Sequence, residues 1–186
     1  MQKTLIILLM LVCSFFSVIK TADAQTEIQV FGSDYPEQLK QYVEDCLFIL
    51  GLDRKVRISI FITHHLPYPY EGRTIKHNTD TFGTDQFSVH ILNGIKTKEQ
   101  LLVLAHELIH VKQYASRKLD IRGEDVYWHG KKFHLKADQL DKSPWENEAY
   151  ADDDRLTKQF FAIRKQTQKA INELAAINKR PEMRSR

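Results

Sequence analysis

The chain has 186 residues, of which 27 are Lys or Arg and 24 are Asp or Glu, so its formal net charge is only +3. This balance excludes a polycation that binds nucleic acid through charge alone, and we expect no nucleic-acid partner. The length suits one hydrophobic core and is short for two, which predicts a single domain.

The N-terminus has the three parts of a secretory signal peptide. Lys3 supplies the positive charge, residues 5–18 form the apolar core, and Ala22-Asp23-Ala24 is a small-residue cleavage site. We therefore expect cleavage before Gln25, an exported protein that is periplasmic or secreted, and no stable membrane insertion afterwards. A membrane anchor is the competing interpretation, but the apolar core is shorter than the roughly 18 residues that a span requires.

Cysteine usage is sparse. Cys13 lies in the predicted signal peptide, and Val12 stands before it where a lipoprotein signal has a small residue. Removal of residues 1–24 leaves Cys46 alone, so no intramolecular disulfide can form. Its apolar neighbours predict a buried thiol, and a disulfide between two chains is the alternative.

Four elements and one long loop are predicted before the central part of the chain. Apolar residues recur at helical spacing in one of these segments and alternate in the strands, and Pro and Gly are concentrated in the loop. In chain order we expect a strand at 27–31, a helix at 36–50, a strand at 56–63, a loop at 66–84 and a strand at 86–92.

A buried helix follows. Thr97 with Gln100 has the pattern of a capping box, and residues 101–111 are apolar almost all round. Within this run, His106 and His110 are four residues apart and so project from one helix face. Two imidazoles at this spacing can hold one zinc ion, and Glu107 can act as general base toward a water beside it. The alternative is an ordinary pair of hydrogen-bonded core histidines.

On these residues the chain resembles the zincin metallopeptidases, and among them the gluzincins, whose third zinc ligand is a glutamate on a later helix. Metzincins fit worse, because they need Gly and His where this chain has Gln113 and Ser116. The resemblance implies an α+β fold, namely a minimal zincin-like domain over residues 25–178. A small mixed sheet would pack on the central helix, with the strand at 86–92 as the edge strand above the cleft and a long helix at the C-terminus.

The C-terminal third begins with a hairpin and ends with that helix. Residues 127–134 predict a hairpin that turns near Gly130. The helix is expected to begin at Ser143, with Pro144 at its first position, and to run past residue 175 until Pro181 stops it. Residues 179–186 form a basic tail that we expect to be disordered.

The first turns of this helix offer two candidates for the third ligand. Glu146 and Glu148 are about 200° apart on a helix, so only one can face the metal. The apolar stripe that contains Ala149 and Leu156 steps back to Glu146, and Glu146-x-x-Ala149 resembles the zincin pattern. Glu148 remains the alternative, since Asn147-Glu148-Ala149 resembles a thermolysin-like ligand helix and Glu146 could simply complete a capping box with Ser143. We favour Glu146.

The sequence thus predicts a zinc-dependent endopeptidase that is a monomer, with one zinc per chain and a peptide or protein substrate. Tyr150 and Tyr114 are candidates to stabilise the transition state. Asp152 and Asp153 are candidates to orient a histidine ligand. The alternative function is a non-catalytic zinc-binding envelope protein on the same scaffold, and an effector that cleaves one protein target is a third.

Overall fold

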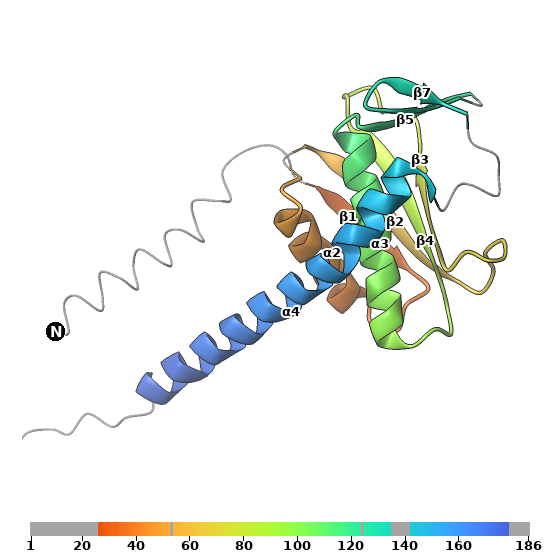
Figure 1. The fold of residues 1–186 in the computed structure, drawn as a ribbon. Coiled ribbons are helices and arrows are strands. Elements are labelled where there is room, and N and C mark those ends of the chain that lie inside the picture. Colours follow the sequence, from red (N-terminus) through yellow and green to blue (C-terminus); the bar gives the residue numbers. More distant parts are fainter. Residues whose placement is uncertain (1–25, 53, 124, 135–141, 179–186) are drawn as a thin grey trace, which may run out of the picture.

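The computed structural model describes residues 26–52, 54–123, 125–134 and 142–178, with side chains up to residue 172 in the last range. It is an α+β domain in which three described helices pack against a four-stranded mixed sheet, with a small three-stranded sheet beside them (Figure 1). The predicted signal peptide (1–24) and basic tail (179–186) lie outside the described residues. The α+β class, the small mixed sheet and the long C-terminal helix are as the sequence predicts.

The main sheet has the strand order β1-β2-β4-β3. Its members are β1 (Glu27–Phe31), β2 (Val56–Thr63), β3 (Gly72–Lys76) and β4 (Asp85–Leu92). β1, β2 and β4 are parallel, and β3 runs antiparallel to β4 at the edge. The second sheet is antiparallel and consists of β5 (Leu119–Arg122), β6 (Asp125–Trp128) and β7 (Lys131–Phe133).

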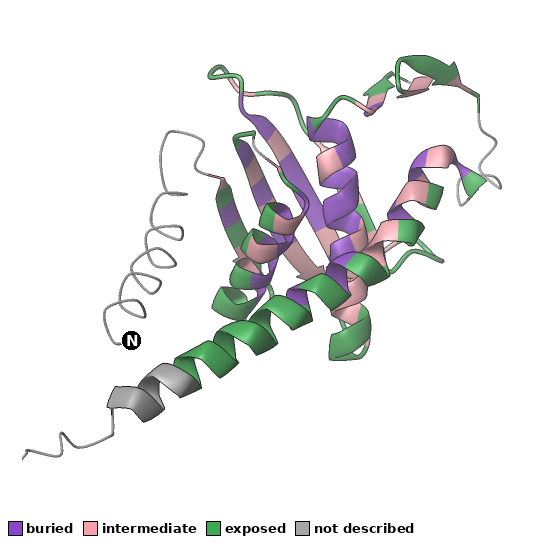
Figure 2. Cartoon of the chain, turned by 60° about the vertical axis from the view of Figure 1, so that its left-hand side comes forward, coloured by how far each residue is buried: buried purple, intermediate pink, exposed green. Residues whose placement is uncertain are grey.

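Alternation in the strands produces the core. The alternate residues Val56, Ile58 and Ile60 of β2 are completely buried, and the inward residues of β4 continue that layer. They pack with the buried faces of α2 (Pro36–Ile49) and α3 (Thr97–Ala115), as the buried stretches in Figure 2 show. α3 is buried on both sides because it lies between the sheet and α4 (Pro144–Asn178).

Three expectations about local structure are wrong. The segment 66–84 is not a continuous loop, because β3 forms within it by pairing with β4. For the same reason the strand at 86–92 is not at the edge of the sheet. The capping box at Thr97 is also absent: the residue before the helix is Lys96, and no side chain caps this end.

The C-terminal helix is 35 residues long and only its first half belongs to the core. Trp145, Ala149, Leu156 and Phe160 are at most 9% exposed, whereas Ile163 is 44% and Ile171 52% exposed. Beyond Phe160 the helix leaves the domain and extends into solvent (Figures 1 and 2). The apolar periodicity therefore predicts the length of the helix correctly but not where its packing ends.

Cys46 is completely buried on α2, and burial raises the pKa of its thiol to about 12. A protonated thiol without solvent access is unreactive, which favours the buried thiol over the disulfide between chains. No helix among the described residues is both long and apolar enough to cross a membrane.

The limit of α4 packing can be measured with two substitutions on one helix. Leu156→Ala should lower the free energy of unfolding by about 2–5 kcal/mol, because it empties a fully buried site. Ile163→Ala should change it by no more than about 0.5 kcal/mol, because that side chain is largely in solvent. Urea unfolding followed by circular dichroism measures both values. Equal losses would mean that the distal half of α4 is packed against something.

Candidate functional site

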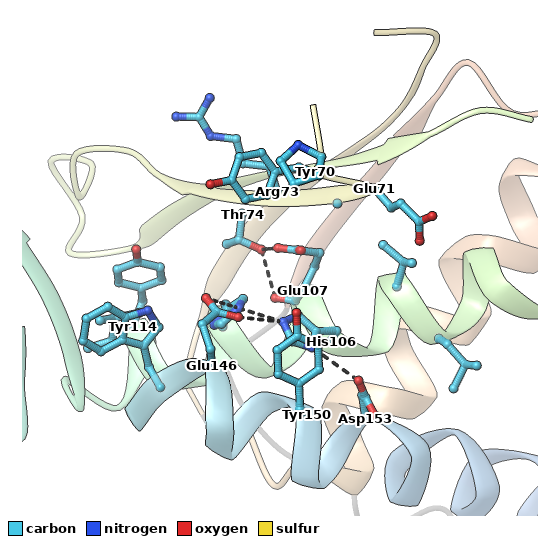
Figure 3. Close-up of a pocket in the computed structure, with 17 residues that line it drawn as sticks. Tyr70, Glu71, Arg73, Thr74, His106, Glu107, Tyr114, Glu146, Tyr150 and Asp153 are labelled. Atoms are coloured by element: carbon cyan, nitrogen blue, oxygen red, sulfur yellow. Dashed lines mark hydrogen bonds and ion pairs between the residues drawn. The ribbon is translucent and has the colours of Figure 1, made fainter. Parts of the chain in front are cut away.

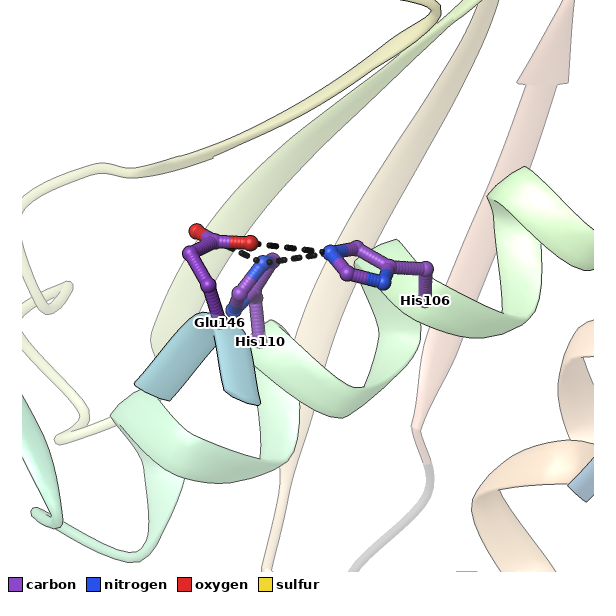
Figure 4. A group of neighbouring side chains, drawn as sticks. All are labelled: His106, His110 and Glu146. Atoms are coloured by element: carbon purple, nitrogen blue, oxygen red, sulfur yellow. Dashed lines mark hydrogen bonds and ion pairs between the residues drawn. The ribbon is translucent and has the colours of Figure 1, made fainter. Parts of the chain in front are cut away.

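The histidines of the motif come from the buried middle of α3. His110 is 8% exposed and its neighbours Ala105, Leu108 and Ile109 are almost inaccessible, so the apolar residues fix the rotation of the helix in the core. With that rotation, the two imidazoles point from one face of α3 toward the first turns of α4 (Figure 4).

The start of α4 brings Glu146 to the same place. The Ser143 hydroxyl accepts a hydrogen bond from the backbone N–H of Glu146 at 3.3 Å, which caps the helix. The side chain of Glu146 is then directed at the histidines: Oε2 lies 3.1 Å from His106 Nε2, and Oε1 lies 3.4 Å from His110 Nε2. The two Nε2 atoms are 3.2 Å apart.

The donor set fits a zinc ion. One atom each of His106, His110 and Glu146 lies within 4.8 Å of the others, which is the spacing that three ligands of one small cation require (Figure 4). Two nitrogens and one carboxylate oxygen form a donor set that zinc accepts, and three protein ligands leave a fourth position open.

The remaining nitrogen of each imidazole has its own partner. His106 Nδ1 lies 3.3 Å from Asp153 Oδ2, and His110 Nδ1 lies 2.8 Å from Gln113 Oε1. Gln113 is completely buried and its amide donates to the carbonyl of Trp145 at 3.0 Å, so its orientation is fixed. Such partners hold both rings with Nε2 toward the ligand position, as the histidines of metal sites are held. Of the two aspartates considered from the sequence, Asp153 occupies this place.

Electrostatics keep Glu146 ionised. Burial raises its pKa, but hydrogen bonds and charge from His106 and His110 outweigh burial and lower the pKa to about 2. For His110 the balance is similar: burial lowers its pKa, and Glu146 with Glu107 raises it by more. The cluster thus presents a carboxylate rather than a carboxylic acid, which is the form that binds a cation.

Glu148 has a different environment. Its Oε2 lies 3.0 Å from Lys118 Nζ, and its Oε1 accepts a hydrogen bond from the Gln113 amide at 3.3 Å. The structure therefore brings Glu146, and not Glu148, to the two histidines.

Glu107 lies on the side of α3 that faces β3 and is only 6% exposed. The Thr74 hydroxyl is 2.6 Å from its Oε2 (Figure 3). Burial raises the pKa of Glu107, while His110 and the Thr74 hydrogen bond oppose that rise without cancelling it. A buried carboxylate with a raised pKa is a better proton acceptor than a solvated one.

One open cavity of about 440 Å³ is lined by His106, Glu107, His110, Glu146 and Asp153. Residues 69–74 form its upper wall, and α3 and α4 form its floor (Figure 3). Both candidate tyrosines reach it. Tyr150 is 58% exposed with its ring 4.6 Å from that of His106, and Tyr114 is buried, which raises the pKa of its phenol to about 12. Both phenols line the cavity and are candidate hydrogen-bond donors to a group bound there.

Sequence reasoning missed the upper wall. Thr74 contacts Glu107 directly, and Gly72 leaves space that a side chain would take from Glu107, yet both lie in the segment predicted as loop. The only local indication of a strand there is the pair of adjacent β-branched residues Thr74 and Ile75. A second hollow of about 340 Å³ continues along residues 73–79.

Comparison of the chain with models of protein families, with characterised proteins and with solved structures found no match.

If Glu146 is the third zinc ligand, as the sequence predicts, loss of Glu146 and loss of Glu148 should affect zinc binding differently. Glu146→Ala should weaken zinc binding by more than the roughly 10–100-fold that loss of an outer partner costs, because one of three ligands is gone. Glu148→Ala should leave zinc affinity nearly unchanged, because it removes only a contact with Lys118 and Gln113. Competition with a chromogenic chelator measures both affinities. The reverse order would make Glu148 the ligand.

Proposed function

We propose that this protein is a zinc-dependent metallopeptidase of the gluzincin type. The observation that carries the proposal is the convergence of His106, His110 and Glu146 on one point, with the buried Glu107 beside them in the same cavity. When bound there, zinc would act as a Lewis acid that polarises a carbonyl and acidifies a water.

Different residues of the site would then bind the metal, orient its ligands and transfer the proton. His106, His110 and Glu146 hold the metal, and Asp153 and Gln113 hold the rings of the two histidines. Glu107 takes a proton from the attacking water and returns it to the nitrogen of the leaving amine, so the peptide bond is replaced by a carboxyl group and an amine. Tyr150 or Tyr114 can donate a hydrogen bond to the oxygen that becomes negative in the transition state.

The edge strand supports a peptide as substrate. Among the described residues, β3 pairs with β4 on one side and with no strand on the other, and residues along it line both hollows. An extended peptide can add to such an edge through main-chain hydrogen bonds, which do not depend on its sequence. The expected substrate is therefore an unfolded or extended segment of a protein.

One observation favours the non-catalytic alternative, in which the chain only binds zinc. Glu107 is buried and hydrogen-bonded to Thr74, and a carboxylate with a purely structural role would have the same surroundings. Catalysis and structure differ in what a neutral isostere does, which defines the test.

Glu107→Gln should retain fold and zinc content but lower the turnover number by about 10²–10⁴-fold, because the amide cannot take a proton. Glu99→Gln, an exposed glutamate at the start of the same helix, is the matched control and should leave turnover unchanged. Hydrolysis of casein and of a peptide library, followed by mass spectrometry, measures the effect. Cleavage by Glu107→Gln at the wild-type rate contradicts the role of Glu107, and a wild type that carries zinc but cleaves nothing supports the non-catalytic alternative.

We also propose that the protein acts outside the cytoplasm, on the strength of residues 1–24. Expressed in a host with a periplasm, the mature chain should begin near Gln25, and Ala24→Phe should block this cleavage because the site requires small residues. N-terminal sequencing of the exported protein gives the result. A start at Cys13, or an uncleaved wild-type chain in the membrane fraction, would overturn this proposal.

A further inference from the structure

The edge strand β3 lines the cavity and also contacts Glu107, the proposed general base. Thr74 and Gly72 are two residues apart on β3 and so share the face toward α3: the Thr74 hydroxyl contacts Glu107, and a side chain at position 72 would meet Glu107. We propose that Thr74 is a positioning residue that fixes the carboxylate of Glu107 for proton transfer, and that Gly72 provides the space this arrangement needs. This inference rests on the proposed peptidase function.

The Thr74 hydroxyl lies between two oxygens of the same residue. Its Oγ1 is 2.6 Å from Glu107 Oε2 and 3.0 Å from the Glu107 carbonyl oxygen. Threonine is branched at Cβ and its χ1 is stiff, so this hydroxyl has a fixed position relative to the strand. The flexible side chain of the glutamate is thereby held near its tip by a rigid donor on another element.

Gly72 leaves room for the other oxygen of the Glu107 carboxylate. A Cβ at this position would lie 2.6 Å from Glu107 Oε1 and 2.6 Å from Val103 Cγ1, well inside van der Waals contact. The glycine is therefore required by the close approach of β3 to α3. Together the two residues define the place of the carboxylate: a hydrogen bond holds one oxygen, and the other occupies space that exists only because residue 72 has no side chain.

This arrangement couples substrate binding to the base. A peptide that adds to the free edge of β3 extends the sheet on the strand that holds Glu107, so the strand that orients the substrate also orients the proton acceptor. An error of about 1 Å in the position of a catalytic group can cost roughly 100-fold in rate. We therefore expect the hydroxyl of Thr74 to affect turnover rather than substrate affinity.

The test compares Thr74→Val, which keeps the shape and removes the hydroxyl, with Thr74→Ser, which keeps the hydroxyl. Thr63→Val at the end of β2 is the matched control, because it removes a threonine hydroxyl from a strand of the same sheet that is separated from β3 by β4 and does not line the cavity. Each full-length variant is assayed for zinc content, melting temperature, kcat and KM. The substrate is a quenched fluorescent peptide built on a site that the wild type cleaves in casein.

Thr74→Val should lower kcat by about 10- to 100-fold with little change in KM or zinc content. Thr74→Ser should recover most of that loss, and Thr63→Val should match the wild type. Gly72→Ala should also lower kcat, because its methyl group displaces the carboxylate. A wild-type kcat in Thr74→Val, or an effect on KM alone, would overturn the inference.

A stability measurement separates failure of this inference from failure of the proposed function. If the hydrogen bond exists, the melting-temperature loss from Thr74→Val should be smaller in a Glu107→Ala background than in the wild type. An equal loss in both backgrounds shows that the contact is absent and overturns the inference whether or not the protein cleaves peptides. A wild type that cleaves nothing overturns the peptidase function, and with it the catalytic role of Thr74, even where the melting temperatures show coupling.

Discussion

Burial of polar groups in the middle of α3 is the constraint on which the rest of the structure depends. A helix between a sheet and another helix is a favourable place for leucine and an unfavourable one for imidazoles and a carboxylate, unless each finds a partner. His106 and His110 find theirs on α4 and at Gln113, and Glu107 finds its partner on β3. The two elements that flank α3 are thus held in place by the groups that carry the proposed chemistry as well as by apolar packing.

α4 shows how apolar packing sets this geometry. The first half of the helix packs on α3 and α2 through buried residues at helical spacing, namely Trp145, Ala149, Leu156 and Phe160. Tyr42 adds a hydrogen bond from its hydroxyl to the carbonyl of Leu101, which ties α2 to α3. Because this packing fixes the position of α4 over several turns, its first turn can hold the carboxylate of Glu146 within hydrogen-bond distance of the histidines.

The sequence is informative where one rule decides the outcome. Alternation predicts β2 with both of its ends, the apolar run predicts α3 with nearly its observed start, and the spacing of His106 and His110 predicts their shared face. It is uninformative where the outcome depends on a distant partner. β3 forms because β4 offers it an edge, and neither the hydrogen bond of Thr74 nor the close approach of Gly72 leaves a local signature. The burial of Ile163 on α4 is mispredicted for a related reason. Its spacing matches the buried stripe, but the rest of the domain does not extend far enough to cover it.

Glu146 and Glu148 show how helix periodicity can predict which of two neighbouring carboxylates faces a candidate site. On a helix, residues 146 and 148 face directions about 200° apart, so the face that packs decides which one is directed inward. Ala149, completely buried, is three residues after Glu146 and places that side chain beside α3. Glu148 is directed to Lys118, where a cation already compensates its charge. The apolar stripe outweighs the capping box here because Ser143 caps the helix through the backbone N–H of Glu146, which leaves the carboxylate of Glu146 for the histidines.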